Sequence, residues 1–315
     1  MTQPTLASLA LVDPVLTGML VGYAQADDRF VASKVFPQVP SANKSGTYPI
    51  FTKKYWFTDE MVTRAPGSKY ARSGYGVSST TYDTLQWGLE HPIPDENREE
   101  NQTGMPLEMA GVNWLAQKSL IRKERAWAAD FMKTGVWGTD DSNSATDWDD
   151  YAAGDPISDV LTATRTISNN TGSAANTMVL GYIVHNALVN HPDIIDRVKY
   201  TSPALQAQIM GILAAAFGVQ NYWVSKASYN SANEGQTFAG AAIIDDDCLV
   251  CHVTPIPGKF VPSAGYTFSW NGGGGMGEIR TYRDDSVDSD ILKSKEQWDQ
   301  KAVATDVGYF FSDIV

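Results

Sequence analysis

The pattern of apolar and polar residues changes along the chain and divides it into segments. Residues 1–45 carry scattered apolar positions broken by four prolines, so they predict an extended arm without a long helix. Between Gly46 and about Pro92, aromatic and β-branched residues gather in two runs, 48–58 and 75–87, around a polar stretch that contains glycine and proline. These runs predict a long β-hairpin with a flexible tip. Because a two-stranded ribbon is marginal in water by itself, we expect the hairpin to lie against another element or another subunit.

Residues 107–133 contain no proline and one glycine, and they predict a single helix about 40 Å long. At about 100° per residue, its apolar side chains fall in two sectors more than 100° apart. The first sector holds Leu107, Ala110, Trp114, Ile121, Ala128 and Met132, and the second holds Met109, Ala116, Leu120, Trp127 and Phe131. A helix that is apolar on two faces is expected to be covered on both. We expect Trp114 and Ile121 to pack against a sheet that includes the C-terminal strand.

The rest of the chain alternates between helix and strand. After an acidic stretch at 139–155, which predicts a solvated loop, helices are expected at 157–167, 185–198 and 203–217. Strands are expected at 177–181, 220–227, 241–244, 248–253, 266–270 and 278–283. This order predicts a compact α+β module. Residues 291–315 are typical of a strand that returns to an earlier sheet.

Composition narrows the possible functions. The 315 residues include 36 acidic and 24 basic side chains, and the formal charge of −12 disfavours general nucleic-acid binding. The 2 cysteines exclude a disulfide-built secreted scaffold. No run approaches the roughly 20 apolar residues that span a bilayer, and no basic residue precedes the apolar N-terminal stretch as in a signal peptide. We therefore expect no membrane contact and intracellular synthesis.

Two motifs resemble cofactor sites. Cys248, Cys251 and His252 match C-x-x-C-H, but residues three apart on a strand point to opposite faces, which disfavours haem and zinc. Residues 272–277 contain G-x-G-x-x-G, yet the residues that follow predict a strand where a dinucleotide site needs a helix. We therefore expect a glycine-rich hairpin loop there, and no catalytic, cofactor-binding or metal-binding residue is proposed. The protein is predicted not to be an enzyme, and a metal ion in one of the acidic loops stays open.

The order of the segments resembles that of tailed-bacteriophage major capsid proteins with the Hong Kong 97-like fold. Local stretches carry the same resemblance, at 191–200, 213–219, 222–227, 282–291, 296–300 and 304–310. The resemblance implies an α+β fold with an N-terminal arm at 1–45 and an extended β-hairpin, the E-loop, at 46–95. It further implies a long spine helix and P-domain at 96–155, a compact A-domain at 156–283, and a P-domain return strand at 284–315.

The resemblance also implies a function. The protein would be a major capsid protein that self-assembles, as hexamers and pentamers, into an icosahedral head enclosing double-stranded DNA without sequence-specific binding. Its partners would include a portal, a separate scaffold and decoration proteins, and it would reside in the virion after synthesis in the host bacterial cytoplasm. Tyr55, Trp56 and Phe57 in the hairpin are predicted to make intersubunit contacts. The alternatives are an encapsulin-type nanocompartment shell and a glycan-binding protein with an aromatic cleft built from Trp56, Trp87 and Trp270.

Overall fold

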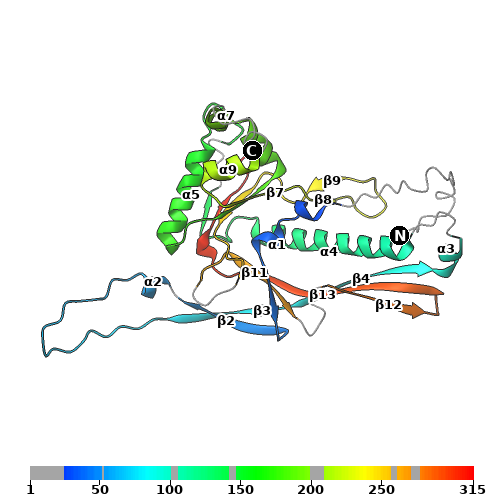
Figure 1. Cartoon of the computed structure of the whole chain (residues 1–315), viewed down its shortest axis with the longest axis horizontal. Helices are drawn as coiled ribbons and strands as arrows, with labels where there is room; N and C mark the ends of the chain where they lie inside the picture. The colour runs from blue at the N-terminus through cyan, green and yellow to red at the C-terminus, as the bar shows by residue number, and fades with distance from the viewer. Residues whose placement is uncertain are drawn as a thin grey trace.

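The computed structural model describes residues 25–51, 53–100, 106–141, 147–198, 209–256, 261–270 and 277–315. Figure 1 shows an elongated sheet with a long helix lying along it, a compact sheet with its own helices beside one end of that helix, and a thin ribbon that projects past the compact part.

Strand β13 (Ser289–Ala302) is the centre of the elongated sheet. Along one edge it pairs antiparallel with β4 (Leu85–Pro94). Strands β11 (Gly265–Trp270) and β12 (Glu278–Asp284) also pair antiparallel with β13, and β1 (Gln38–Ser41) runs parallel to β11. Trp298 pairs with Leu85 of β4 and with Ser269 of β11, so these two strands lie on opposite edges of β13.

Strands β11 and β12 share one edge of β13. Residues 289–295 pair with both β4 and β12, so β12, like β11, lies opposite β4. Ser269 pairs with Trp298, and Glu278 pairs with Lys295. Between these two pairs the chain advances nine residues from β11 to β12, while β13 advances only three. The prediction of a hairpin at this point is therefore wrong. Strands β11 and β12 lie one after the other along the same edge of β13 and do not pair with each other. The element after the glycine motif is a strand, as predicted, while residues 272–276 of that motif lie outside the described residues.

The predicted long helix is confirmed as one continuous element, α4 (Leu107–Phe131). Its N-terminal half packs on the elongated sheet through Leu115, which clusters with Ile93 of β4 and Leu292 of β13. Gly111 permits this close approach, since a Cβ there would come within 2.6 Å of Leu292 Cδ1. The Trp114 ring lies 5.4 Å from that of His91 in β4, as expected of a contact with this sheet. Ile121 is half-buried and not part of the Leu115 cluster.

Coverage of α4 on two faces holds only for its C-terminal half. There Trp127, Ala128 and Phe131 are buried, whereas Met109 in the N-terminal half is 61% exposed. In the C-terminal half, the N-terminal segment of the chain covers the second face of the helix, and its Phe36 ring lies 4.6 Å from that of Phe131.

The N-terminal segment is not an extended arm over its described part. Asp27–Arg29 form a 3-10 turn, η2, and Ala32–Val35 form a short helix, α1. Phe30 and Phe36 are buried, and the N–H groups of Val31 and Ala32 donate to the buried Glu124 carboxylate at 3.0 and 2.8 Å. The expected extended arm is therefore wrong for residues 25–36, because this segment contributes to the core, whereas residues 38–41 form the extended strand β1. Residues 1–24 lie outside the described part.

The compact sheet has the strand order β5-β14-β10-β6-β7. These strands are β5 (Thr139–Asp141), β14 (Gly308–Phe311), β10 (Cys248–Cys251), β6 (Thr177–Gly181) and β7 (Asn221–Ser225). Its helices are α5 (Pro156–Thr171), α6 (Tyr182–Asn190), α7 (Pro192–Val198) and α9 (Ile209–Phe217). A helix was expected at 203–217, and residues 203–208 of it lie outside the described part. Strands β8 (Ser228–Asn230) and β9 (Gly240–Ala242) form a small separate ribbon.

Two expectations for loops and ends need correction. The C-terminal residues do not form one returning strand, because β13 joins the elongated sheet, whereas β14 follows a 3-10 turn, η4 (Thr305–Val307), and pairs with β10. The acidic stretch is not wholly solvated either. Trp148 within it is 1% exposed, and its indole N–H donates to the Asp159 carboxylate at 3.0 Å, so part of this stretch closes the compact core.

Candidate assembly surfaces

A β-hairpin is present where the sequence predicts one, with shorter strands than expected. Strand β2 (Ser45–Phe51) pairs antiparallel with β3 (Val77–Asp83) over seven residues each. Two parts of the predicted strands differ. Residues 53–56 form a short helix, α2 (Lys53–Trp56), and Leu85 onwards belongs to β4 of the elongated sheet. The ribbon therefore ends sooner, and a long loop follows α2.

The base of the ribbon is fixed to the elongated sheet by aromatic stacking. The Tyr82 ring lies 4.5 Å from that of Phe268 in β11, at an interplanar angle of 10°, and the Tyr48 ring lies 5.6 Å from Phe268. The Tyr82 hydroxyl also shares a hydrogen bond of 2.6 Å with Ser41 Oγ of β1. The ribbon thus leaves the body of the protein in a defined direction.

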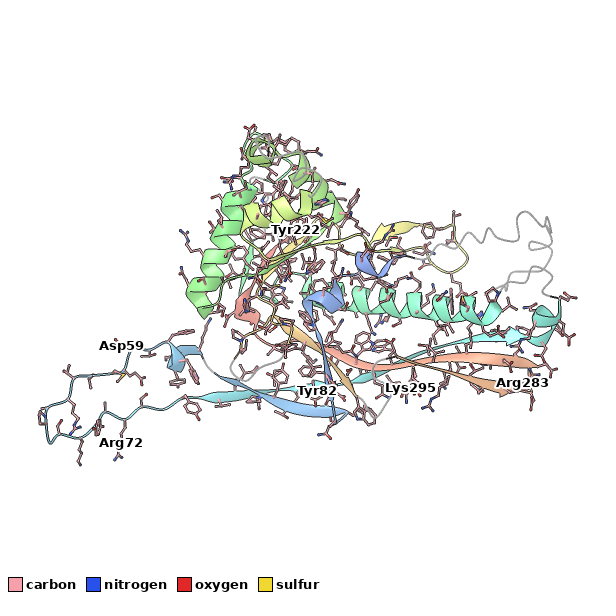
Figure 2. All side chains as sticks on the ribbon, viewed as in Figure 1. Asp59, Arg72, Tyr82, Tyr222, Arg283 and Lys295 are labelled. Atoms are coloured by element: carbon pink, nitrogen blue, oxygen red, sulfur yellow. The ribbon has the colours of Figure 1, made fainter. Side chains whose placement is uncertain are left out.

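The outer part of the hairpin, residues 53–76, is exposed, and we call it the hairpin tip. Figure 2 shows Asp59 and Arg72 on its two limbs, at the far end of the molecule from Arg283. Beyond α2 the tip contains neither helix nor strand, yet it carries large apolar side chains. The exposed ones are Tyr55, Trp56, Phe57, Met61 (95% exposed), Val62, Tyr70 and Tyr75. Exposed apolar side chains gathered in one segment are typical of a protein interaction site.

The three residues predicted for intersubunit contact lie together in and directly after α2. Tyr55, Trp56 and Phe57 are 47, 53 and 63% exposed. Their helix is held near the compact sheet, because the Lys53 ammonium lies 2.8 Å from the Asp306 carboxylate. The Trp56 ring is 6.2 Å from that of Tyr75 across the hairpin. The structure thus groups the three side chains and leaves about half of each accessible. Met61 and Val62 were not predicted as contact residues, although two adjacent apolar residues in a polar loop could have indicated an interaction site.

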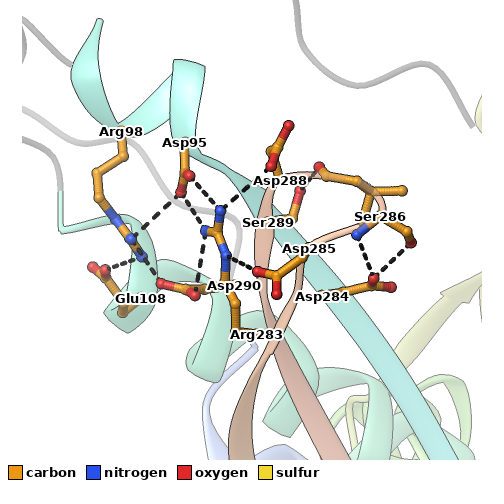
Figure 3. A network of polar contacts seen from close by, with 11 residues as sticks. Asp95, Arg98, Glu108, Arg283, Asp284, Asp285, Ser286, Asp288, Ser289 and Asp290 are labelled. Carbon is orange, nitrogen blue, oxygen red and sulfur yellow. Dashed lines mark hydrogen bonds and ion pairs between the residues drawn. The ribbon is translucent and has the colours of Figure 1, made fainter.

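The opposite end of the elongated sheet carries a network of ion pairs, shown in Figure 3, which we call the distal cluster. Arg283 of β12 donates to both carboxylate oxygens of Asp95 at 2.7 and 2.6 Å. Arg98 of α3 (Asp95–Glu99) donates to Asp290 at 2.7 Å and to Glu108 at 2.9 Å. The hydrogen bond from Arg283 lowers the pKa of Asp95. The network joins three segments and fixes the end of the sheet.

The acidic composition of residues 284–290 predicts only a solvated loop, and nothing in it indicates this network. The pairing depends on the register of β12 on β13, which brings Arg283 opposite Asp290. No local spacing in the sequence reports that register, so this part of the surface could be found only from the structure.

The aromatic residues of the predicted cleft are not brought together. Trp87 on β4 stacks on Trp298 of β13, with ring centroids 5.4 Å apart. Trp270 at the end of β11 donates its indole N–H to the Ala42 carbonyl at 3.1 Å. Trp56 lies on α2 beside Tyr75. Each tryptophan has its own neighbours on a different element, so the structure offers no support for a glycan cleft built from the three.

Cys248 and Cys251 lie on opposite faces of β10, as the strand geometry predicts. Cys248 belongs to one apolar cluster and Cys251 to the other, and both are fully buried. Burial raises the pKa of Cys251 to about 12 and that of Cys248 well above its usual value, so both thiols stay protonated at neutral pH. In the described part of the chain, no three His, Cys, Asp or Glu side chains are grouped as metal ligands would be. None of the helices described there is both long and apolar enough to cross a bilayer.

The chain is similar in sequence and in structure to proteins of bacteriophages. No protein-family model matches the chain. In sequence it is 26% identical over 318 residues to the major capsid protein of Burkholderia phage BcepMu, covering 98% of both chains. In structure it is similar to a phage-related protein from Bordetella bronchiseptica RB50, with a TM-score of 0.68, 24% identity and coverage of 96 and 97%. It is also similar to the capsid of cyanophage P-SCSP1u, with a TM-score of 0.62, 15% identity and coverage of 98 and 94%.

Proposed function

We propose that this chain, which resembles tailed-bacteriophage major capsid proteins and has the Hong Kong 97-like α+β fold, forms the shell of a phage head. The similarity extends over nearly the whole length of the chain and of its relatives. Shell-forming capsid function is therefore the function best supported, and a location in the virion follows from it. This function requires surfaces that bind other copies of the chain.

The observation that carries the proposal is the exposed hairpin tip. Its apolar side chains have no core of their own, and each Å² left in water forgoes about 25 cal/mol of stabilisation. An adjacent copy of the chain can cover them, and Tyr55, Trp56 and Phe57 are the side chains we propose at that contact. In this arrangement the tip gains its stability from the assembly.

Finer features of the proposal follow from the resemblance. We propose the segment names given above, with β11 and β12 counted with the elongated sheet because they pair with β13. Assembly as hexamers and pentamers, an icosahedral head around double-stranded DNA, and partners such as a portal, a separate scaffold and decoration proteins are parts of the same proposal. So are synthesis in the host bacterial cytoplasm and a role that is structural and not enzymatic.

Electron microscopy of the full chain tests this function. We expect closed icosahedral shells when the chain is expressed with the proteins of its head, and the shells should contain DNA. Shells filled with one specific protein cargo would support the encapsulin-type alternative. A protein that stays monomeric under all assembly conditions and binds an oligosaccharide would overturn the proposal in favour of glycan binding.

A further inference from the structure

Three basic side chains form a stripe along one flank of α4. Lys118, Arg122 and Arg125 are spaced four and three residues apart, so they lie on the same side of the helix, over about 10 Å. All three are exposed. We call them the α4 cation stripe. Because the whole chain has a formal charge of −12, such a local concentration of positive charge needs a reason.

The stripe is held in place without being neutralised. Each cation lies over an aromatic ring, with the Lys118 ammonium 5.6 Å from the Trp114 centroid, the Arg122 guanidinium 4.1 Å from Trp87 and the Arg125 guanidinium 4.2 Å from Tyr229. Rings orient a cation but carry no net charge to cancel it.

Carboxylates do not cancel the charge of the stripe either. Within the described part of the chain, none of the three cations lies within ion-pairing distance of a carboxylate, whereas the neighbouring Lys123 lies 3.0 Å from Glu296. The positive charge of the stripe is therefore available to a ligand.

We propose that the α4 cation stripe binds the phosphate backbone of the DNA inside the shell, a proposal that rests on the capsid function above. Duplex DNA carries one negative charge per about 1.7 Å of its axis, so about 10 Å of duplex presents more phosphates than the stripe has cations. The contact involves charge alone and reads no sequence. The acidic remainder of the chain repels DNA, which keeps the contact weak and lets the genome move along the wall.

The test measures binding of the unassembled full chain to a fluorescent duplex of mixed sequence by anisotropy, over a range of salt concentrations. For three phosphate contacts, the slope of log K against log salt should be about −2.7. The variant Lys118→Gln/Arg122→Gln/Arg125→Gln should bind about tenfold or more weakly at low salt and lose most of that slope. Arg122→Lys/Arg125→Lys keeps the charge and should bind as the parent does.

A matched control removes the same charge elsewhere. Arg64→Gln/Lys69→Gln/Arg72→Gln on the hairpin tip should leave DNA binding unchanged, and circular dichroism should show every variant folded. The proposal fails if the stripe variant binds like the parent, or if the tip variant loses as much affinity. It also fails if polyglutamate displaces DNA at lower charge concentration, which would identify an acidic protein segment as the ligand. Electron microscopy of the parent chain scores shell formation separately. A parent that binds DNA but forms no shells contradicts the capsid function, whereas a parent that forms shells but whose DNA binding does not depend on the stripe contradicts the stripe proposal alone.

Discussion

The compact sheet and the hairpin tip contain similar side chains and use them in opposite ways. All four residues of β10 are buried, whereas the tip exposes Trp56, Phe57 and Met61. The compact part buries its apolar surface within the chain, so we expect it to be stable as a monomer. The tip has apolar surface without a core, so its order and its purpose depend on a neighbour. Substitutions in the two regions should therefore affect different measurements.

The largest effect is expected from Tyr55→Ser/Trp56→Ser/Phe57→Ser. Because these side chains are exposed in the monomer, their loss should leave the compact sheet folded. It should abolish closed shells, because it removes the proposed contact with an adjacent copy of the chain. Sedimentation velocity measures the shells, and circular dichroism measures the fold.

The control for this variant is Tyr55→Phe/Trp56→Phe/Phe57→Tyr, which keeps most of the apolar area and should still form shells. Shells of normal size from the serine variant, or unfolding of its monomer, would mean that the tip is an internal element, and the contrast between the two regions would disappear.

The next effect tests the other half of the comparison. Leu249→Ala removes a fully buried side chain from the apolar cluster on one face of β10 and should lower the free energy of unfolding by about 2–5 kcal/mol. Urea denaturation of the monomer measures this change. Met61→Ala, which alters an exposed side chain of the tip, is the control and should change the free energy by less than about 0.5 kcal/mol. Equal losses in the two variants would contradict the distinction.

A smaller effect concerns the pH dependence of the compact part. Burial, together with neighbouring Asp246, Asp313 and Asp245, raises the pKa of Asp247 to about 6. A carboxyl whose pKa is higher in the folded state holds its proton more tightly there, so stability should fall as pH rises from about 4 through 6. Asp247→Asn should remove this fall and raise the free energy of unfolding at pH 8 by about 1–2 kcal/mol, a value reduced for the partial exposure of the group. Thermal unfolding between pH 4 and 8 measures it.

The exposed Asp149→Asn serves as the control for this pH dependence and should leave the pH profile of the parent unchanged. A parent protein whose stability rises steadily from pH 4 to 8, with Asp247→Asn following the same curve, would contradict the role given to Asp247.

The smallest effect locates the boundary between the two regions. Tyr82→Phe removes the hydroxyl bonded to Ser41 Oγ, and Ser41 keeps its hydrogen bond to the Asn43 carbonyl, so the loss should be about 0.5–1 kcal/mol. Hydrogen exchange should become faster in β2 and β3 and stay unchanged in β10. Unchanged exchange in the ribbon would mean that stacking on Phe268 alone fixes its base.

Local periodicity predicted the elements whose contacts are local. The 107–133 pattern found α4 with an error of two residues at its end, and the buried run 177–181 matches β6. Periodicity could not show that Val31 binds Glu124, because the two residues are 93 positions apart and neither has a distinctive local pattern.

The candidate surfaces divide in the same way. Tyr55, Trp56 and Phe57 were identifiable as an aromatic cluster in a hairpin, although their helical conformation was not. The distal cluster depends on strand register, and the cation stripe became meaningful only when Trp87 and Tyr229 were seen beneath Arg122 and Arg125. Spacing places cations on a common face, but only the tertiary structure shows which of them lack a carboxylate.

The contact between Glu124 and the N-terminal segment has a consequence for synthesis of the chain. Phe30 and Phe36 leave the ribosome early, yet the carboxylate that holds their segment lies 93 residues later, or roughly 5–20 s of translation at about 5–20 residues per second. The Thr267 hydroxyl, which donates to the Phe36 carbonyl, follows 231 residues after it. Until those residues are synthesised, the segment lacks the partners that bury it, so we expect slow or stalled translation to make nascent chains more prone to aggregate.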